Sequence, residues 1–149
     1  MKLCIVCSTG GHLTEVILLA KDYYKKHEHF FVTFKRIDSV ELSRKHKVYF
    51  VVDPKKNPLS FMHDFLQSFF IFLKEKPDAV ISTGAGVALP LLLIAKLMGK
   101  KTVYIEPSCN IKLPSATGKI AYKFVDLFLV QWKENLKFYP KAKFKEGIF

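Results

Sequence analysis

The stretch that decides the fold is KLCIVCSTGGHLTEVILLAKDYYKK, residues 2–26. Its first residues, Lys2–Cys7, form a short apolar run that is typical of a buried β-strand. The apolar spacing from Leu13 to Lys26 is that of a helix, and the turn STGGH at residues 8–12 joins the two segments. A strand that runs through a glycine turn into a helix predicts one unit of a parallel α/β sheet.

The same alternation of strand and helix continues through the rest of the 149 residues. Further strands are expected at residues 30–34, 48–52, 79–82, 102–105 and 127–131. Helices are expected at residues 39–45, 59–75, 87–98 and 115–124. Short apolar strands that are each followed by a helix indicate a parallel sheet covered on both faces. Because crossovers between parallel strands are right-handed, the sequence predicts a single Rossmann-like, doubly wound α/β domain over residues 1–149.

The chain carries 24 Lys and Arg against 13 Asp and Glu, a net charge of +11, and 50% of its residues are hydrophobic. This apolar content excludes a disordered basic tail, and the 14 phenylalanines exceed what the core of such a domain needs. Some apolar surface is therefore expected to face a partner or a membrane. Arg36 and Arg44 are the only arginines, and a lysine-rich surface suits anionic lipid headgroups better than the reading of bases.

No stretch is expected to span a bilayer, because the longest uncharged segment, residues 79–95, is interrupted by two glycines and a proline. The apolar start resembles a signal peptide only superficially, since the Gly-Gly-His turn stands where a cleavage site would be. The cysteines form neither a zinc-ligand pattern nor a disulfide spacing, so we expect a reducing cytoplasm and no metal; they are Cys4, Cys7 and Cys109.

Glycine-rich or polar loops follow three of the expected strands: STGGH at residues 8–12, STGAG at 82–86 and EPSCN at 106–110. Because ligands bind at the carboxyl ends of parallel strands, these loops are expected to converge on one edge of the sheet. The expected substrate-contacting residues in them are Ser8, Thr9, Gly10, Gly11, Gly84, Ala85, Gly86 and Ser108.

The Gly10-Gly11 turn brings main-chain N–H groups close to any ligand at the start of the following helix, where an anion such as a phosphate is favoured. The turn can equally serve tight packing alone. Neither a GxGxxG pattern nor a GK[ST] pattern is present, so the sequence predicts no bound dinucleotide or other cofactor.

Two residues at these loops are candidate general bases. His12 can accept a proton or donate a hydrogen bond to a hydroxyl or phosphate, or it can merely cap the loop. Glu106 leaves the strand at 102–105 and can accept a proton, bind a pair of hydroxyls or form a salt bridge. Asp53 is expected to serve an ordinary turn before Pro54. The other histidines are expected to be exposed to solvent; they are His27, His29, His46 and His63.

The helix expected at residues 59–75 has a wide, phenylalanine-rich apolar half. Packing of this half against the sheet is the favoured interpretation, and contact with a membrane is the alternative. Its polar half contains Ser60, His63, Asp64, Gln67, Ser68 and Lys74. Its apolar half contains Met62, Leu66 and Leu73, together with the candidate membrane residues Phe61, Phe65, Phe69 and Phe72.

Taken in order, the motifs STGGH, STGAG, YIEPS, SATGK, FLVQW and YP resemble a known family over nearly the whole chain. The chain resembles the membrane-recruiting subunit of the two-component UDP-N-acetylglucosamine transferase of asparagine-linked glycosylation. It is still more similar to the bacterial counterparts that serve capsule and exopolysaccharide synthesis. The resemblance implies the N-terminal, acceptor-side half of a GT-B glycosyltransferase, with a separate small subunit that binds most of the UDP-sugar.

The resemblance also implies roles for individual positions. The acceptor would be a polyprenyl-diphosphate-linked sugar at the cytoplasmic face of the membrane, and His12 or Glu106 would be the base, with His12 slightly preferred. Residues 143–149 would be the tail that docks on the donor-binding subunit. Eukaryotic members begin with a membrane-spanning helix, so attachment of this chain would instead be peripheral, through lysines and apolar side chains at an anionic surface.

Two other classes of function remain open from the sequence. A non-catalytic adaptor that only recruits a partner enzyme to the membrane would not need the glycine loops, His12 or Glu106. The net charge of +11 also suggests a nucleic-acid-binding domain, although arginine is scarce and no RNA-binding motif is present. A self-sufficient nucleotide-dependent enzyme would need a second domain.

Overall fold

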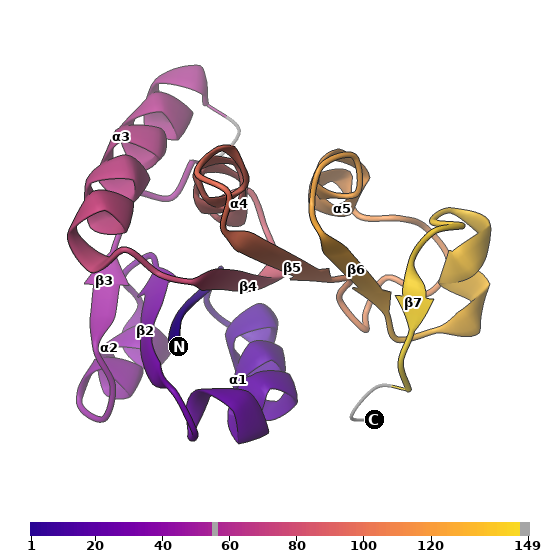
Figure 1. Cartoon of the computed structure of the whole chain (residues 1–149), viewed down its shortest axis with the longest axis horizontal. Coiled ribbons are helices and arrows are strands. Elements are labelled where there is room, and N and C mark those ends of the chain that lie inside the picture. The colour runs from indigo at the N-terminus through magenta and orange to yellow at the C-terminus, as the bar shows by residue number, and fades with distance from the viewer. Residues whose placement is uncertain (55–56, 147–149) are drawn as a thin grey trace.

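The computed structural model describes residues 1–54 and 57–146, which form a parallel sheet with helices on both faces (Figure 1). The strands of this part of the chain lie in the order β3-β2-β1-β4-β5-β6-β7, and every neighbouring pair is parallel. The strands are β1 (Lys2–Cys7), β2 (Glu28–Thr33), β3 (Val48–Phe50), β4 (Ala79–Gly84), β5 (Lys101–Ile105), β6 (Leu127–Val130) and β7 (Lys143–Phe144). The helices are α1 (Gly11–Tyr24), α2 (Ile37–Ser43), α3 (Pro58–Glu75), α4 (Ala88–Leu97), α5 (Ala116–Ala121) and the 3₁₀-helix η1 (Lys133–Lys137). The predicted doubly wound α/β domain is confirmed.

Helices α1 and α2 cover one face of the sheet, and α3, α4 and α5 cover the other (Figure 1). Alternate residues of β1 therefore enter two different cores, as the two-residue period of a strand requires. Leu3 and Ile5 pack with the apolar side of α1, whereas Cys4 and Val6 pack with residues of α3 and α4. Burial on both faces explains why this strand is almost entirely apolar.

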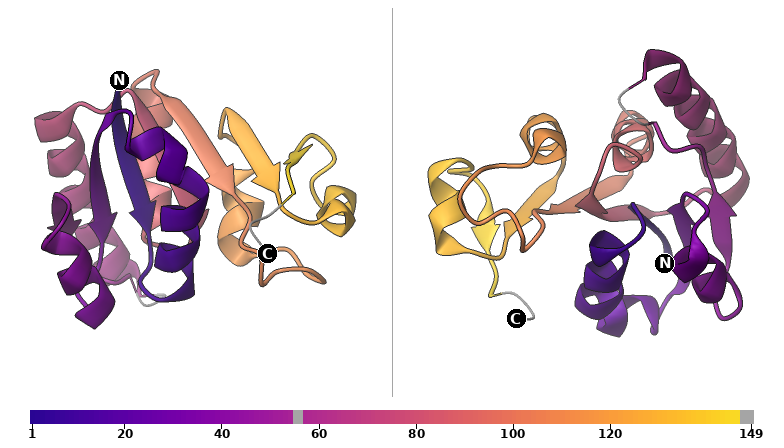
Figure 2. Two further views of the ribbon diagram at one scale, coloured as in Figure 1. Left: turned by 90° about the horizontal axis from the view of Figure 1, so that it is seen from below. Right: turned by 180° about the vertical axis from the view of Figure 1, so that it is seen from behind.

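The elements beyond β6 were not expected from the sequence. Strand β7 pairs with β6 at only two positions, Leu129 with Lys143 and Val130 with Phe144. Figure 2 shows η1 and β7 at the opposite end of the sheet from β3. So short a strand and a single 3₁₀ turn have too few residues to produce a hydrophobic period, which explains why sequence reasoning missed them.

Helix α3 turns part of its polar side toward the protein and much of its apolar side away from it. Asp64, Ser68 and Glu75 are buried, as are Ile71 and Phe72. The expectation that the apolar half of this helix packs against the sheet is therefore wrong for most of that half, although Phe65 and Phe72 do pack against the core. Its exposed apolar side chains are Leu59, Phe61, Met62, Leu66, Phe69, Phe70 and Leu73.

The four candidate membrane residues of α3 divide accordingly. Phe61 and Phe69 are exposed, whereas Phe65 is half-buried against the core. Phe72 is only 2% exposed and belongs to that core, so its assignment to a membrane surface is corrected. Phe70, which the sequence did not single out, is 67% exposed.

Polar groups near the edge strand β3 explain the orientation of α3. The side-chain oxygen of Gln67 accepts a hydrogen bond from the N–H of Val52 at 2.8 Å. Glu75 lies 2.6 Å from the Nζ atoms of both Lys2 and Lys47. Although burial acts in the opposite direction, the hydrogen bonds from these lysines lower the pKa of Glu75 to about 2. Rotation of the apolar half inward would break all these contacts and leave buried polar groups without partners.

A pair of histidines lies at the other end of the sheet from the glycine loops. His29 Nε2 lies 3.0 Å from His46 Nδ1, and His29 Nδ1 lies 3.0 Å from the carbonyl oxygen of His27. Because the carbonyl only accepts, His29 Nδ1 donates to it and His29 Nε2 accepts from Nδ1 of His46. These three histidines are half-buried, which corrects the expectation of solvent exposure; His63 is exposed.

We expect His46 to make the free energy of unfolding depend on pH. Burial, together with the nearby His29 and Lys45, lowers the pKa of His46 below its usual 6.5. The unfolded chain therefore binds more protons than the folded chain as the pH falls. The contribution of His46 to the free energy of unfolding is thus complete above about pH 6.5 and is lost below it. Urea unfolding of the wild type and His46→Gln from about pH 5 to about pH 8 measures the effect. The advantage of the wild type should shrink as the pH falls, and parallel curves would contradict the assignment.

Candidate functional site

The three loops singled out in the sequence meet at the carboxyl edge of the sheet, where strand order reverses between β1 and β4. The Thr83 hydroxyl donates to the carbonyl oxygen of His12 at 2.8 Å, which joins the second loop to the first. The N–H of Ser108 donates to Glu15 of α1 at 2.8 Å, which joins the third loop to the helix that follows the first. The structure therefore builds one site from segments far apart in the sequence, at the place where doubly wound sheets bind ligands.

The first glycine turn is open. Gly10 has φ 77° and ψ −138°, a conformation that favours glycine, and α1 begins at the next residue. A Cβ atom added at Gly10 or Gly11 would meet no described atom within 4 Å, so neither glycine is there for close packing. The N–H groups of the first turn of a helix have no intrahelical acceptor, and this turn contains no acidic side chain. The Gly10 N–H donates to the Asp38 carboxylate at 2.6 Å, so the donors that suit an anion in the open space are the N–H groups of α1 from Gly11 onward.

The second glycine loop is closely packed instead. Gly84 has φ 116°, and a Cβ atom there would lie 2.9 Å from the Tyr104 hydroxyl and 3.6 Å from Cε1 of His12. Ala85 also has a positive φ, of 68°, which is uncommon for a residue with a side chain. A Cβ atom at Gly86 would lie 3.3 Å from the Pro54 ring. This loop is therefore fixed against the histidine and against the turn that follows β3.

His12 is half-buried between the two glycine loops. Its Nδ1 atom is buried and has no hydrogen-bond partner among the residues that the structure describes. Burial lowers the pKa of its imidazole, with nearby Glu15 and the bond from Thr83 acting in the opposite direction. The ring is therefore neutral at neutral pH, which is the form that can accept a proton.

Glu106 has a different place from the one expected. Its side chain is fully buried, and it accepts hydrogen bonds from the N–H of Ser115 at 2.7 Å and from the Ser115 hydroxyl at 2.9 Å. Burial raises the pKa of this carboxyl group, while the bonds from Ser115 act against the rise. The carboxylate therefore holds the start of α5 and has no exposed surface.

Sequence reasoning missed the residues that hold the third loop in place. Glu15 is buried and accepts hydrogen bonds from the Ser108 N–H and, at 2.6 Å, from the Gln131 side chain. The same amide nitrogen of Gln131 donates to the Glu106 carbonyl oxygen at 3.0 Å, and the Trp132 indole donates to the Ser108 carbonyl oxygen at 2.7 Å. The signal in the sequence was a carboxylate on the apolar face of α1, together with the polar end of the FLVQW motif.

The remaining loop residues are divided between the interior and the surface. Ser8 is buried, whereas Thr9 and Ser108 are half-buried. The backbone of Ser108 is bonded at both its N–H and its carbonyl group, and the Asn110 carbonyl accepts from Asn135 at 2.9 Å. The third loop is thus held by main-chain bonds at Ser108 and Asn110.

Solved structures share this architecture. MurG from Acinetobacter baumannii matches with a TM-score of 0.74 at 16% identity, over 89% of this chain and 42% of MurG. A UDP-N-acetylglucosamine 2-epimerase from Rickettsia bellii matches with a TM-score of 0.77 at 17% identity, over 99% of this chain and 44% of the epimerase. The chain thus spans less than half of either protein. At these identities the likeness shows the fold, which is that of the N-terminal half of a GT-B protein and confirms the predicted fold class.

Sequence comparison identifies the family within this class. The family described as "Oligosaccharide biosynthesis protein Alg14 like" matches residues 52–149. The UDP-N-acetylglucosamine transferase subunit ALG14 of Rattus norvegicus is 30% identical over 95% of this chain and 80% of its own length, and that of Homo sapiens is 27% identical with the same coverage. The chain therefore belongs to the Alg14-like family, which confirms the expectation that it is a glycosyltransferase subunit.

A bacterial relative links this family to the fold match. The UDP-N-acetylglucosamine–N-acetylmuramyl-(pentapeptide) pyrophosphoryl-undecaprenol N-acetylglucosamine transferase of Myxococcus xanthus is 28% identical over 91% of this chain and 38% of its own length. The Alg14-like chain therefore corresponds in sequence to a part of the longer Myxococcus transferase.

Two glycine substitutions separate packing from ligand space. A Cβ atom at Gly118 would lie 2.2 Å from Glu106 Oε2 and 2.6 Å from the Ser115 hydroxyl, so Gly118→Ala should destabilise the protein by about 1–3 kcal/mol through overpacking. Gly11→Ala, which enters open space within α1, should leave stability unchanged or slightly higher. Urea unfolding of both variants measures the difference. Equal unfolding midpoints for Gly118→Ala and the wild type would contradict the packing described around Glu106.

Proposed function

We propose that this chain is the acceptor-binding subunit of a two-component transferase that moves N-acetylglucosamine from UDP-N-acetylglucosamine to a polyprenyl-diphosphate-linked sugar, in capsule, exopolysaccharide or related glycan synthesis. The observation that carries the proposal is the open Gly10-Gly11 turn beside the neutral, half-buried imidazole of His12. The named functions of the ALG14 subunits and of the Myxococcus transferase support it, since both act with UDP-N-acetylglucosamine.

The geometry divides the chemistry between the glycine turn and the histidine. The N–H groups of the first turn of α1, from Gly11 onward, and the positive end of this helix bind the diphosphate of the acceptor, since the Gly10 N–H is already bonded to Asp38. His12 accepts the proton of the acceptor hydroxyl while that oxygen forms a bond to the anomeric carbon of the donor. The bond between this carbon and the diphosphate of UDP breaks, and UDP leaves with the electron pair. Glu106 and Glu15 keep the loops in position.

The donor-binding half belongs to a second, small subunit under this proposal. The chain covers less than half of the GT-B proteins that it matches, and the similar ALG14 proteins are named as transferase subunits, which supports a separate partner. The docking segment is the tail at residues 143–149, of which 147–149 lie outside the described residues. Its described part includes β7, which pairs with β6 and presents Phe144 beside Lys133, whose Nζ lies 5.5 Å from the ring centre. An edge strand with an exposed aromatic residue suits a partner that extends the sheet.

Peripheral contact with the inner face of the membrane takes place through the outer surface of α3. Within residues 1–54 and 57–146, no helix is both long and apolar enough to cross a membrane. The exposed side chains Leu59, Phe61, Met62, Leu66, Phe69, Phe70 and Leu73, defined here as the α3 surface, form an apolar face of the kind that lies in a lipid interface. Lys74 lies on the same helix, and each lysine near an anionic leaflet contributes about 1 kcal/mol.

The role of His12 is tested with the reconstituted pair of subunits. His12→Ala should lower the transfer rate by about 10²–10⁴-fold, which is the usual contribution of a general base, while binding of the partner subunit stays as in the wild type. Gly11→Ala should reduce transfer as well, because its methyl group occupies the anion space. The measurement is transfer of radiolabelled sugar to a lipid-linked acceptor. Wild-type rates in both variants would favour the non-catalytic adaptor instead.

The membrane proposal is tested with vesicles that contain anionic lipid. Replacing Phe61 and Phe70 together by serine should weaken vesicle binding by about tenfold or more, since burial of each ring in lipid contributes at least about 1.5 kcal/mol. Tyr23→Ser is the matched control, because Tyr23 is 59% exposed on α1 at the opposite face of the sheet. Cosedimentation at low and high salt measures the apolar and the electrostatic contributions to vesicle binding. Equal binding of the double variant and the control would exclude the α3 surface as the contact.

A further inference from the structure

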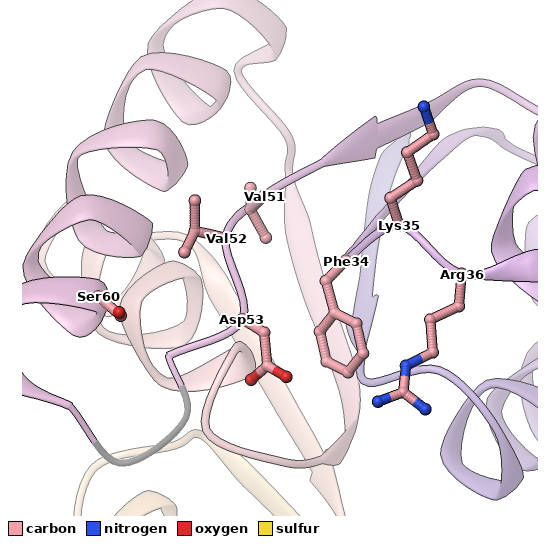
Figure 3. A pocket seen from close by; sticks show the side chains of 7 residues that line it. All are labelled: Phe34, Lys35, Arg36, Val51, Val52, Asp53 and Ser60. Carbon is pink, nitrogen blue, oxygen red and sulfur yellow. The ribbon is translucent and has the colours of Figure 1, made fainter.

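A pocket of about 350 Å³ opens beside the glycine loops, at the carboxyl ends of β2 and β3. It is lined by Phe34 and Arg36 after β2, by Val51 and Asp53 after β3, and by Ser60 of α3 (Figure 3). None of these lining residues takes part in the proposed binding of the diphosphate or in proton transfer to His12. Its volume lies in the range of about 300–1,000 Å³ that small-molecule sites occupy.

Two contacts make this pocket continuous with the glycine loops. The N–H of Gly10 donates to Asp38 of α2 at 2.6 Å, so the first glycine turn is tied to the helix that begins directly after Arg36. On the other side, Gly86 packs against Pro54 so closely that a Cβ atom added to this glycine would lie 3.3 Å from the proline ring. The Gly10 N–H is thus already bonded, and a molecule whose anionic group binds at the next donors, the N–H groups of the first turn of α1 from Gly11 onward, has this pocket as its neighbour along the sheet edge.

The lining combines the groups that bind a sugar ring. In Figure 3 the Asp53 carboxylate faces the Phe34 ring across the pocket, while the Lys35 side chain points away. The Arg36 guanidinium carbon lies 5.6 Å from the centre of the Phe34 ring, a stacking that holds the guanidinium in place. A carboxylate accepts hydrogen bonds from hydroxyls, a guanidinium donates to them, and the aromatic and valine side chains cover the C–H surface of a ring.

We infer that this pocket binds the sugar ring of the acceptor, a pyranose joined through its anomeric carbon to a diphosphate. The inference rests on the proposed function. Asp53 accepts from a pair of ring hydroxyls, Arg36 donates to the ring substituents, and the diphosphate extends from the pocket to the Gly10-Gly11 turn. Asp53 is then a specificity-determining residue for the acceptor sugar.

Steady-state kinetics of the reconstituted pair test the inference. Asp53→Asn and Arg36→Gln should each raise the KM for the lipid-linked acceptor by tenfold or more and leave the KM for UDP-N-acetylglucosamine unchanged. Arg44→Gln is the matched control, because it removes the same charge at the other end of α2, outside this pocket. It should behave as the wild type, so a general electrostatic effect on membrane binding would move Arg36→Gln and Arg44→Gln alike. An unchanged acceptor KM in both pocket variants would overturn the inference while the proposed function stands.

A binding measurement on the single chain separates the two proposals from each other. N-acetylglucosamine 1-phosphate is titrated into the wild type and Asp53→Asn, with inorganic pyrophosphate as the second probe, and binding is followed by NMR. Asp53→Asn should weaken binding of the sugar phosphate by about tenfold and leave binding of pyrophosphate unchanged. This result would support the sugar pocket even if the pair transferred no sugar, in which case only the proposed function would fail. Equal losses for both probes, or none for either, would overturn the pocket assignment.

Discussion

The buried carboxylate of Glu15 is the interaction on which the carboxyl edge of the sheet depends. It joins α1, the loop after β5 and the end of β6 through hydrogen bonds from Ser108 and Gln131. A buried carboxylate without such donors would be strongly destabilising, so these two contacts are required rather than optional. His12 lies one turn earlier on the same helix, at the i, i+3 spacing that places both side chains on one face. The carboxylate that holds the third loop therefore lies on the same helix face as the candidate base.

The site combines a rigid part with an open part. The loops that contain Gly84 and Ser108 are packed or bonded through their main chains, whereas the turn at Gly10 has open space around it. Glu106 contributes to the rigid part, because its carboxylate holds Ser115 and leaves no room for a side chain at Gly118. Groups that stabilise charge in catalysis must be oriented before the reaction begins. A rigid frame around one open, donor-rich turn meets this requirement.

The sequence predicted the fold and the convergence of the three loops on one edge of the sheet because both follow from local patterns. Strand-helix alternation determines the parallel sheet, and glycine turns after the strands mark its ligand edge. The orientation of α3 could not be predicted in the same way, because an amphipathic period shows that a helix has two faces but not which face meets the protein. The contacts that decide it, from Gln67 to Val52 and from Glu75 to Lys2 and Lys47, join residues distant in the chain. The same limit hid the role of Glu15 and led to the expectation that Glu106 faces substrate.

The outward apolar face of α3 and the pocket share one end of the same helix, and this has a consequence for a lipid-linked substrate. Ser60 lines the pocket, while its neighbours Leu59 and Phe61 point to solvent on the α3 surface. If that surface lies in the lipid interface, the pocket mouth is held close to the headgroups, and a sugar diphosphate on a polyprenyl chain reaches it without leaving the membrane. The inward polar residues of α3 then have a functional reason as well as a structural one, because they hold the helix with its apolar side turned outward. A soluble donor can arrive from the opposite side, where the partner subunit would complete the cleft.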